Sequence, residues 1–301
     1  MIDVLINRID ELNNPTVVGL DPTIEMIPGY LKEAKFAEFG KTPQAVAEMF
    51  VEFNRQIMLA VQGIVPAVKP QVAFYERYGI HGLMAYERTC SLAKKMGFIV
   101  IGDIKRGDIG STAAAYAAHI GGTDIEGQKY DLWHEDFVTV NPYLGVDGIK
   151  PFVDACNAND KGIFVLVKTS NPSSSQLQDK LVDGVPVYLH VAALVDEWGR
   201  DAMGEKGYSK VCAVVGATHR EQGARVRQAL PNTFFLVPGY GAQGGTAEDI
   251  RGFFDSNRRG CIVNSSRGII AAYKKNEKYG EKDFADAARD AALAMQKDIM
   301  G

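Results

Sequence analysis

The sequence predicts an α/β protein, a (β/α)8 (TIM) barrel that forms a single domain over residues 1–301 and carries surface insertions. Eight short apolar runs alternate with helical patterns, which is the order of elements in such a barrel. Runs such as FIVIGD and GIFVLVK are apolar almost without a break, as expected for strands buried on both faces of a parallel sheet. An open doubly wound sheet is the alternative architecture.

The predicted strands are short and rich in β-branched and aromatic residues. Between them, apolar residues recur at intervals of three and four, which predicts amphipathic helices over 46–64 and 284–295. The chain exceeds the roughly 250 residues typical of the fold, and the excess is assigned to insertions at 25–42, 121–135 and 171–185. In chain order, the predicted strands are Thr16–Leu20, Ala67–Phe74, Phe98–Asp103, Phe137–Asn141, Gly162–Lys168, Lys210–Gly216, Thr233–Pro238 and Cys261–Asn264.

Composition restricts the partners. The net charge of −4 leaves no basic footprint for nucleic acid or an anionic membrane, so local cations must bind any anionic ligand. No apolar run approaches the roughly 18 residues of a membrane span. The four cysteines are far apart and form no C-x-x-C pair, so we expect a reduced, cytoplasmic protein.

Charged residues gather where the predicted strands end. Asp103, Lys105 and Asp108 lie in GDIKRGDIGST, Asp21 ends the first strand, and Lys69 lies in the second. Residues two apart in a strand share a face, so Asp103 and Lys105 are expected on one side, with Asp108 in the turn beyond. A solvated or ion-paired loop would explain one such pair, but five charges favour an active site at the mouth of the barrel. Opposite charges hold one another ionised, which suits Lys105 to donate a proton rather than form a Schiff base.

A glycine-rich segment, VPGYGAQGGTAED, follows the seventh predicted strand. It satisfies G-x-G-x-x-G, so a dinucleotide-binding turn is one interpretation. However, it comes late in the chain, and the next strand ends without an acid for a ribose. A phosphate site built from the loops after strands seven and eight is favoured. Its expected components are Gly241, Gly244 and Gly245, a helix starting near Thr246, and the guanidinium of Arg267.

The histidines predict no metal site. None of the five forms H-x-H or H-E-x-x-H, and the cluster His134, Glu135, Asp136 comes before the fourth strand, at the wrong end of a barrel. No motif for an organic cofactor is present. Thr246 and Asp249 are expected to form a helix cap.

With these motifs in place, the chain resembles orotidine 5'-phosphate decarboxylases of the longer bacterial branch over essentially its whole length. The block D-x-K-x-x-D-I-x-x-T (103–112), T-S-N-P (169–172), P-x-x-x-x-Q (238–243) and S-R-G (266–268) carry the resemblance. It implies cofactor-independent decarboxylation of orotidine 5'-phosphate to UMP and CO2, the last step of de novo pyrimidine synthesis. It also implies a homodimer in which Asp108 and Thr112 reach the neighbouring subunit's site.

The resemblance assigns roles residue by residue. Lys105 would protonate C6 of the pyrimidine, Asp103 would lie against the departing carboxylate, and Lys69 and Asp108 would complete the charged network. Many relatives have glycine where this chain has Ser266. The substrate-binding residues that the resemblance implies are Asp21 with Lys69 for the ribose, Ser170 for the base, Gln243 between base and phosphate, Arg267 for the phosphate, and Ile109, Thr112, Pro238 and Ser266.

Two other functions stay open. A 3-keto-gulonate-phosphate decarboxylase or hexulose-phosphate synthase shares D-x-K-x-x-D but uses Mg²⁺. A carboxylate on the second strand would favour that metal, whereas this chain has Lys69 there. A non-catalytic protein that binds a phosphate ligand is the third possibility.

Overall fold

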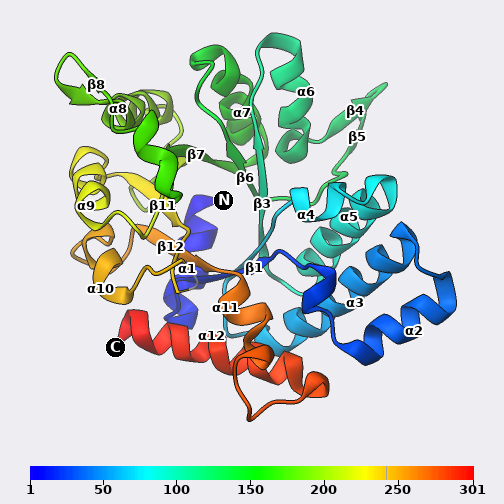
Figure 1. Cartoon of the computed structure of the whole chain (residues 1–301). Helices are drawn as coiled ribbons and strands as arrows, with labels where there is room; N and C mark the ends of the chain where they lie inside the picture. Colours follow the sequence, from blue (N-terminus) through cyan, green and yellow to red (C-terminus); the bar gives the residue numbers. More distant parts are fainter. Residues whose placement is uncertain (242) are drawn as a thin grey trace. The chain divides into compact units, whose positions relative to one another are not determined.

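The computed structural model describes residues 1–241 and 243–301. Eight parallel strands form a closed barrel in the order β1-β12-β11-β10-β7-β6-β3-β2 (Figure 1). The predicted (β/α)8 barrel is therefore confirmed. Its strands are β1 (Thr16–Leu20), β2 (Ala67–Pro70), β3 (Ile99–Arg106), β6 (Phe137–Val140), β7 (Gly162–Lys168), β10 (Ser209–Val215), β11 (Thr233–Val237) and β12 (Cys261–Ser265).

The helices include both patterns that the sequence predicted. Pro43 starts α3 at a position where its missing N–H costs nothing, and the side chain of Thr42 accepts a hydrogen bond from Ala45 N as the N-cap. The α-helices are α1 (Ile2–Leu12), α2 (Gly29–Phe39), α3 (Pro43–Val61), α4 (Ala73–Glu76), α5 (Gly79–Lys95), α6 (Gly110–Gly121), α7 (Val146–Asn159), α8 (Val187–Gly199), α9 (Arg220–Ala229), α10 (Ala247–Ile250), α11 (Arg267–Ile270) and α12 (Phe284–Met300).

The chain is divided into two compact units, and each is described by itself. The Lys69 unit comprises Ile9–Ile104, Trp133–Glu135 and Ser265–Gly301, and within it β1 pairs with β2 and β2 with β3. The Lys105 unit comprises Met1–Arg8, Lys105–Leu132 and Asp136–Asn264, and within it β6, β7, β10, β11 and β12 pair in that order. The expectation of a single domain stays a prediction.

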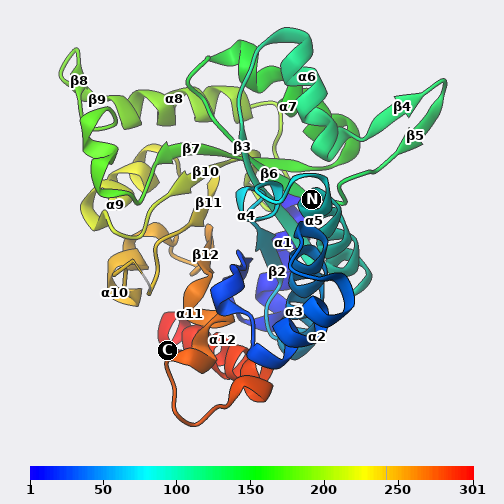
Figure 2. The ribbon, with the colours of Figure 1, turned by 45° about the vertical axis from the view of Figure 1, so that its right-hand side comes forward.

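The three predicted insertions contain elements outside the barrel sheet. The first holds α2, the second the hairpin β4 (Thr123–Ile125) and β5 (Gln128–Tyr130), and the third the hairpin β8 (Leu181–Val182) and β9 (Val185–Pro186). The hairpin β4–β5 extends beyond the end of α6, and the hairpin β8–β9 lies at the start of α8, where His190 contacts Val182 O (Figures 1 and 2).

Two predicted strand boundaries were wrong. The second strand was expected to reach Phe74, but β2 ends at Pro70 and Ala73–Glu76 form α4. Local hydrogen bonds turn the chain, because the Gln71 side chain accepts from Ala73 N, and Val72 O accepts from Tyr75 N and Glu76 N. The third strand continues beyond Asp103 to Arg106.

Buried apolar residues form the core of the barrel. No described helix is long and apolar enough to cross a bilayer. The four cysteines are free thiols and are buried. Burial raises the pKa of Cys156 to about 12, so this thiol stays protonated and unreactive near neutral pH.

Candidate active site

Lys69 lies at the centre of a charged group in the Lys69 unit. It is part of β2, is 3% exposed, and its Nζ lies 2.8 Å from Oδ2 of Asp103 on β3 and 3.9 Å from Oδ1 of Asp21, just after β1. Burial lowers the pKa of Lys69, but the charges of Asp103 and Asp21 outweigh it and raise the pKa above its ordinary value. Lys69 is therefore a permanent cation at neutral pH, held between two carboxylates.

Asp21 has one oxygen engaged and one available. Ser266 Oγ donates a hydrogen bond to Asp21 Oδ2 at 2.6 Å. Asp21 Oδ1 is buried and has no hydrogen-bond partner among the described residues, so it can accept a hydrogen bond from a hydroxyl group of a ligand. Ser266, expected to bind substrate, thus also fixes the orientation of this carboxylate. The next residue, Arg267, is exposed at the start of α11.

Two residues that support Asp21 were not predictable from the sequence. The hydroxyl of Tyr75, a fully buried residue of α4, donates to Leu20 O at 2.8 Å. Asn54, buried in α3, donates in turn to the Tyr75 hydroxyl at 2.8 Å. Burial first, and the charge of Asp21 second, raise the pKa of Tyr75, so the phenol stays a donor that holds the end of β1.

Lys105 lies near the end of β3, in the Lys105 unit, with its backbone in the left-handed region at φ 47°. A lysine there is strained by about 1 kcal/mol or more. Its N–H donates to Thr139 Oγ1 on β6 at 3.0 Å. Side chains alternate between the two faces of a strand only where the backbone is extended, and at Lys105 it is not. The rule therefore no longer supports the expectation that Asp103 and Lys105 face the same side. The side chain of Lys105 is exposed.

The loop after Lys105 leads into α6. Asp108 Oδ1 accepts a hydrogen bond from Ile109 N at 2.7 Å, as expected for a residue in a turn. Its carbonyl oxygen lies against α7, because a Cβ on Gly148 would lie 2.8 Å from it. Ile109 and Thr112, which flank the start of α6, are both exposed.

The structure brings Ser170 and Gln243 together in the Lys105 unit. Ser170 follows β7, and Gly239 follows β11 and Pro238. A Cβ on Gly239 would lie 3.1 Å from the Cβ of Ser170 and 3.3 Å from Oε1 of Gln243. Glycine at 239 therefore lets the two side chains approach one another across the start of the loop.

The glycine-rich loop is a series of tight turns. Gly239, Gly241 and Gly244 have φ of 96°, 71° and 97°, which favour glycine. Gly241 N donates to Gly245 O, Gly244 N to Gly241 O and Gly245 N to Gly239 O. The amides of the three predicted glycines are therefore used within the loop, and the helix after it is a single turn rather than the long helix of a dinucleotide fold.

The helix expected to start near Thr246 is a single turn, α10 (Ala247–Ile250), and Thr246 and Asp249 form the predicted capping box at its start. One turn has few aligned peptide dipoles, and Asp249 already places a carboxylate there. The partial charge expected to help bind phosphate is therefore small, which leaves the guanidinium of Arg267 as the main group for that task.

The side chains of His134, Glu135 and Asp136 each have a partner of their own. His134 pairs with Glu87, Tyr86 donates to Glu135, and Lys161 pairs with Asp136 at 3.3 Å. In residues 1–241 and 243–301, no group of three or more His, Cys, Asp or Glu is arranged as metal ligands.

Two sets of site residues have thus been described. One comprises Asp21, Lys69, Asp103, Ser266 and Arg267, and the other Lys105, Asp108, Ser170, Gln243 and the glycine loop. Each residue lies at or just beyond the C-terminal end of its own barrel strand, which is where (β/α)8-barrel enzymes carry their chemistry. A charged group together with a glycine-rich loop after the seventh strand defines a barrel enzyme for phosphorylated ligands.

Comparison with known proteins gives the particular family. Residues 18–281 match the Orotidine 5'-phosphate decarboxylase / HUMPS family. The chain is 44% identical to an orotidine 5'-phosphate decarboxylase of Caldicellulosiruptor saccharolyticus, with 99% of this chain and 97% of the relative covered. A relative of that name from Rhodopirellula baltica is also 44% identical, over 95% of this chain and 94% of its own length.

The same family appears among solved structures. The OMP decarboxylase of Leishmania donovani superimposes with a TM-score of 0.73 at 28% identity, covering 98% of each chain. The chain belongs to the orotidine 5'-phosphate decarboxylase / HUMPS family.

Proposed function

We propose that this chain decarboxylates orotidine 5'-phosphate to UMP and CO2 without a cofactor, as the last step of de novo pyrimidine synthesis. The relatives' names support the reaction. The observation that carries it is the buried ion pair between Lys69 and Asp103, which puts a cation where the Mg²⁺-dependent members need a carboxylate.

The chemistry explains the residues. When the C6–carboxylate bond breaks, its electron pair stays in an sp² orbital at C6 with no adjacent carbonyl to accept it. A fixed ammonium beside C6 stabilises this developing charge, and we assign that ammonium to Lys105. Lys105 then transfers a proton to C6, which forms the new C–H bond, and the neutral amine regains a proton from water.

The remaining roles follow from the charges of the side chains and from the atoms that can hydrogen-bond a ligand. Asp103, fixed by Lys69, lies against the departing carboxylate, and Asp108 completes the network. The unoccupied Asp21 Oδ1 accepts a ribose hydroxyl. Ser170 binds the edge of the base and Gln243 spans base and phosphate, consistent with their proximity around Gly239. Arg267 binds the phosphate together with the glycine loop, in which the amides of Gly241, Gly244 and Gly245 exchange their bonds within the loop for bonds to the ligand.

The second candidate is a Mg²⁺-dependent 3-keto-gulonate-phosphate decarboxylase or hexulose-phosphate synthase. Absorbance assays with orotidine 5'-phosphate and with the sugar phosphates, each run with and without EDTA, separate the two. Turnover of orotidine 5'-phosphate that EDTA leaves unchanged supports the decarboxylase, and turnover of a sugar phosphate that disappears with EDTA supports the metal enzyme. Protein that binds UMP but leaves orotidine 5'-phosphate intact would instead be a non-catalytic binder.

Substitution of Arg267 tests the phosphate site. Arg267→Ala should raise KM at least about tenfold, because a charge-assisted bidentate bond to phosphate is worth about 1.5–3 kcal/mol. The effect on kcat should be smaller. Arg289→Ala, an exposed arginine on α12, is the matched control and should leave KM unchanged. An unchanged KM in Arg267→Ala would remove this residue from the phosphate site.

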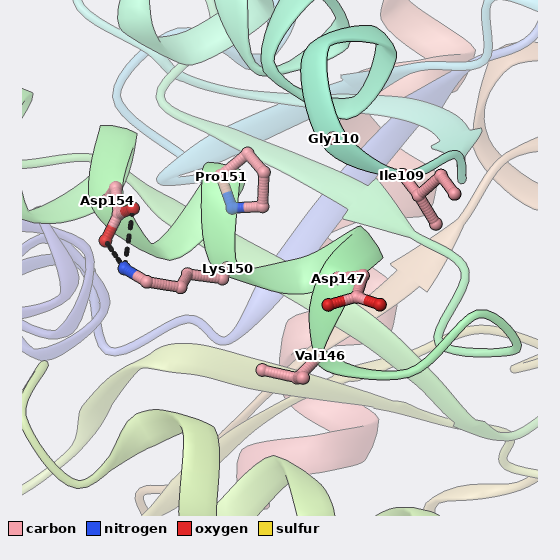
Figure 3. A pocket seen from close by; sticks show the side chains of 7 residues that line it. All are labelled: Ile109, Gly110, Val146, Asp147, Lys150, Pro151 and Asp154. Atoms are coloured by element: carbon pink, nitrogen blue, oxygen red, sulfur yellow. Dashed lines mark hydrogen bonds and ion pairs between the residues drawn. The ribbon is translucent and has the colours of Figure 1, made fainter.

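We further propose a homodimer in which Asp108 and Thr112 act at the partner's site. A pocket of about 400 Å³ lies beside them, lined by Ile109, by Gly110 at the start of α6 and by residues of α7 (Figure 3). Ile109 and Val146 are about half exposed there, and Tyr143 is 81% exposed. Exposed apolar side chains around a pocket are typical of a surface covered by a partner.

Mixing two inactive variants tests whether sites are shared. If Asp108 acts across the interface, combining Lys105→Ala with Asp108→Ala chains should restore up to about a quarter of wild-type activity, since half of randomly mixed dimers are hybrids with one intact site. Differently tagged chains, purified together, would demonstrate the exchange. No recovery after demonstrated exchange would mean that each site lies within one subunit.

A further inference from the structure

A second buried lysine lies at the end of β7, immediately before the segment that carries Ser170. Lys168 is fully buried, and its Nζ donates to Asp179 Oδ1 at 2.8 Å and to Ser174 Oγ at 3.0 Å. The ring of Tyr188 lies 5.8 Å from the same ammonium. A buried ammonium is costly unless it is paired and hydrogen-bonded. Both of its hydrogen-bond partners come from the third insertion, whose residues 171–180 we name the strap.

The strap also binds the next residue of the chain. Gln178 Oε1 accepts a hydrogen bond from Thr169 N at 2.9 Å, and Gln178 Nε2 donates to Thr169 Oγ1 at 2.7 Å. Two consecutive residues of the strap, 178 and 179, therefore hold the two consecutive residues that precede Ser170. Four hydrogen bonds from the strap to Lys168 and Thr169 are therefore made within two residues of Ser170, the residue that we assign to the base.

Ser170 is also held from the opposite side. Thr218 Oγ1 donates to Ser170 O at 2.9 Å. Gly216, at the end of β10, approaches so closely that a Cβ there would lie 2.7 Å from the Cα of Ser170. Ser170 thus has its backbone fixed by β10 and its loop, and its preceding residues fixed by the strap.

Packing alone does not call for this ion pair. An apolar residue at the end of an otherwise apolar strand would cost no desolvation, and buried ion pairs are often no more stabilising than apolar substitutes. What the ion pair adds is a constraint on position, because the buried ammonium is left unpaired unless Asp179, and with it the strap, stays within hydrogen-bonding distance. Position matters where a side chain must meet a ligand within a few tenths of an ångström.

We propose that Lys168 and Asp179 are positioning residues for Ser170, and that the strap thereby sets the affinity of the site for the pyrimidine base. The proposal rests on the proposed function, in which Ser170 binds the edge of the base. It gives the third insertion a role in substrate selection.

The test uses two ligands that differ by the base alone. Asp179→Asn keeps the shape of the side chain and removes the charge that pairs with Lys168. We expect the Kd for UMP to rise about tenfold, which is about 1.4 kcal/mol, while the Kd for ribose 5-phosphate stays within twofold. A general loss of structure would instead weaken the binding of both UMP and ribose 5-phosphate. Asp183→Asn, the same exchange at an exposed position in the adjacent hairpin turn, should change neither.

Two further variants decide the outcome if Asp179→Asn does not fold. Gln178→Ala removes the bonds to Thr169 without leaving a buried charge, and should raise the Kd for UMP alone. Gln176→Ala, two residues earlier and exposed, should have no effect. In a Ser170→Ala background, the Asp179 substitution should lose most of its effect on UMP binding, because it acts through Ser170.

The proposal is overturned if the strap variants bind UMP as well as wild type does, or lose UMP and ribose 5-phosphate equally. The function itself fails differently. A wild-type chain that binds neither UMP nor orotidine 5'-phosphate contradicts the decarboxylase, whatever the strap variants do.

Discussion

Lys105→Ala should abolish turnover while leaving the product bound. We expect kcat to fall at least about a thousandfold, because the ammonium both stabilises the carbanion and supplies the proton. UMP has no charge at C6, so its Kd should change only severalfold. Single-turnover decarboxylation and calorimetric titration with UMP measure the two quantities.

The backbone at this position supplies a second variant. Lys105 has φ 47°, a conformation that glycine adopts without strain. Lys105→Gly should therefore be as inactive as Lys105→Ala without being less stable. Lys129→Ala, an exposed lysine on β5, is the control and should keep full activity. A Lys105 variant that retained more than about a tenth of wild-type activity would refute its role as the acid.

The Lys69→Met variant should unfold at a lower urea concentration than wild type, and it should also lose activity. Removing one member of a buried pair leaves a carboxylate desolvated and unpaired, which typically costs about 3–5 kcal/mol. Here two carboxylates lose their shared cation, since Asp103 lies 2.8 Å and Asp21 3.9 Å from its Nζ. Urea denaturation followed by circular dichroism gives the change in the free energy of unfolding.

An exposed ion pair of the same residue types is the control. Lys278 and Asp290 pair at 3.2 Å, with side chains 68% and 49% exposed. Lys278→Met should lower the free energy of unfolding far less than Lys69→Met, because solvent screens such pairs. If the two variants were destabilised equally, the Lys69 pair would not be the buried electrostatic centre described above.

The barrel, and the charged residues at the ends of its strands, could be predicted because their signals are local. A strand buried on both faces needs an uninterrupted apolar run, so a charge at its end, such as Lys69 or Asp103, is conspicuous. The chemistry then follows from topology, since parallel strands in a barrel end at the same rim.

The features that the sequence did not reveal depend on distant contacts or backbone geometry. Ser266 and Asp21 bond across 245 positions, and no pattern at either residue indicates the other. Lys105 does not follow the alternation of side chains along a strand, because its φ is positive. A positive φ cannot be predicted from the fact that the residue is a lysine. Lys168 ends GIFVLVK and could have been noted as a charge at a strand end, but its partners in the insertion were not predictable.

The most direct test of the account follows the proton at C6. EDTA-treated protein is incubated with orotidine 5'-phosphate in D2O, and the product is examined by proton NMR. We predict stoichiometric UMP that carries deuterium at C6, formed at the same rate with and without EDTA and not formed by Lys105→Ala. Unchanged orotidine 5'-phosphate, or UMP formed only when Mg²⁺ is added back, would contradict the account.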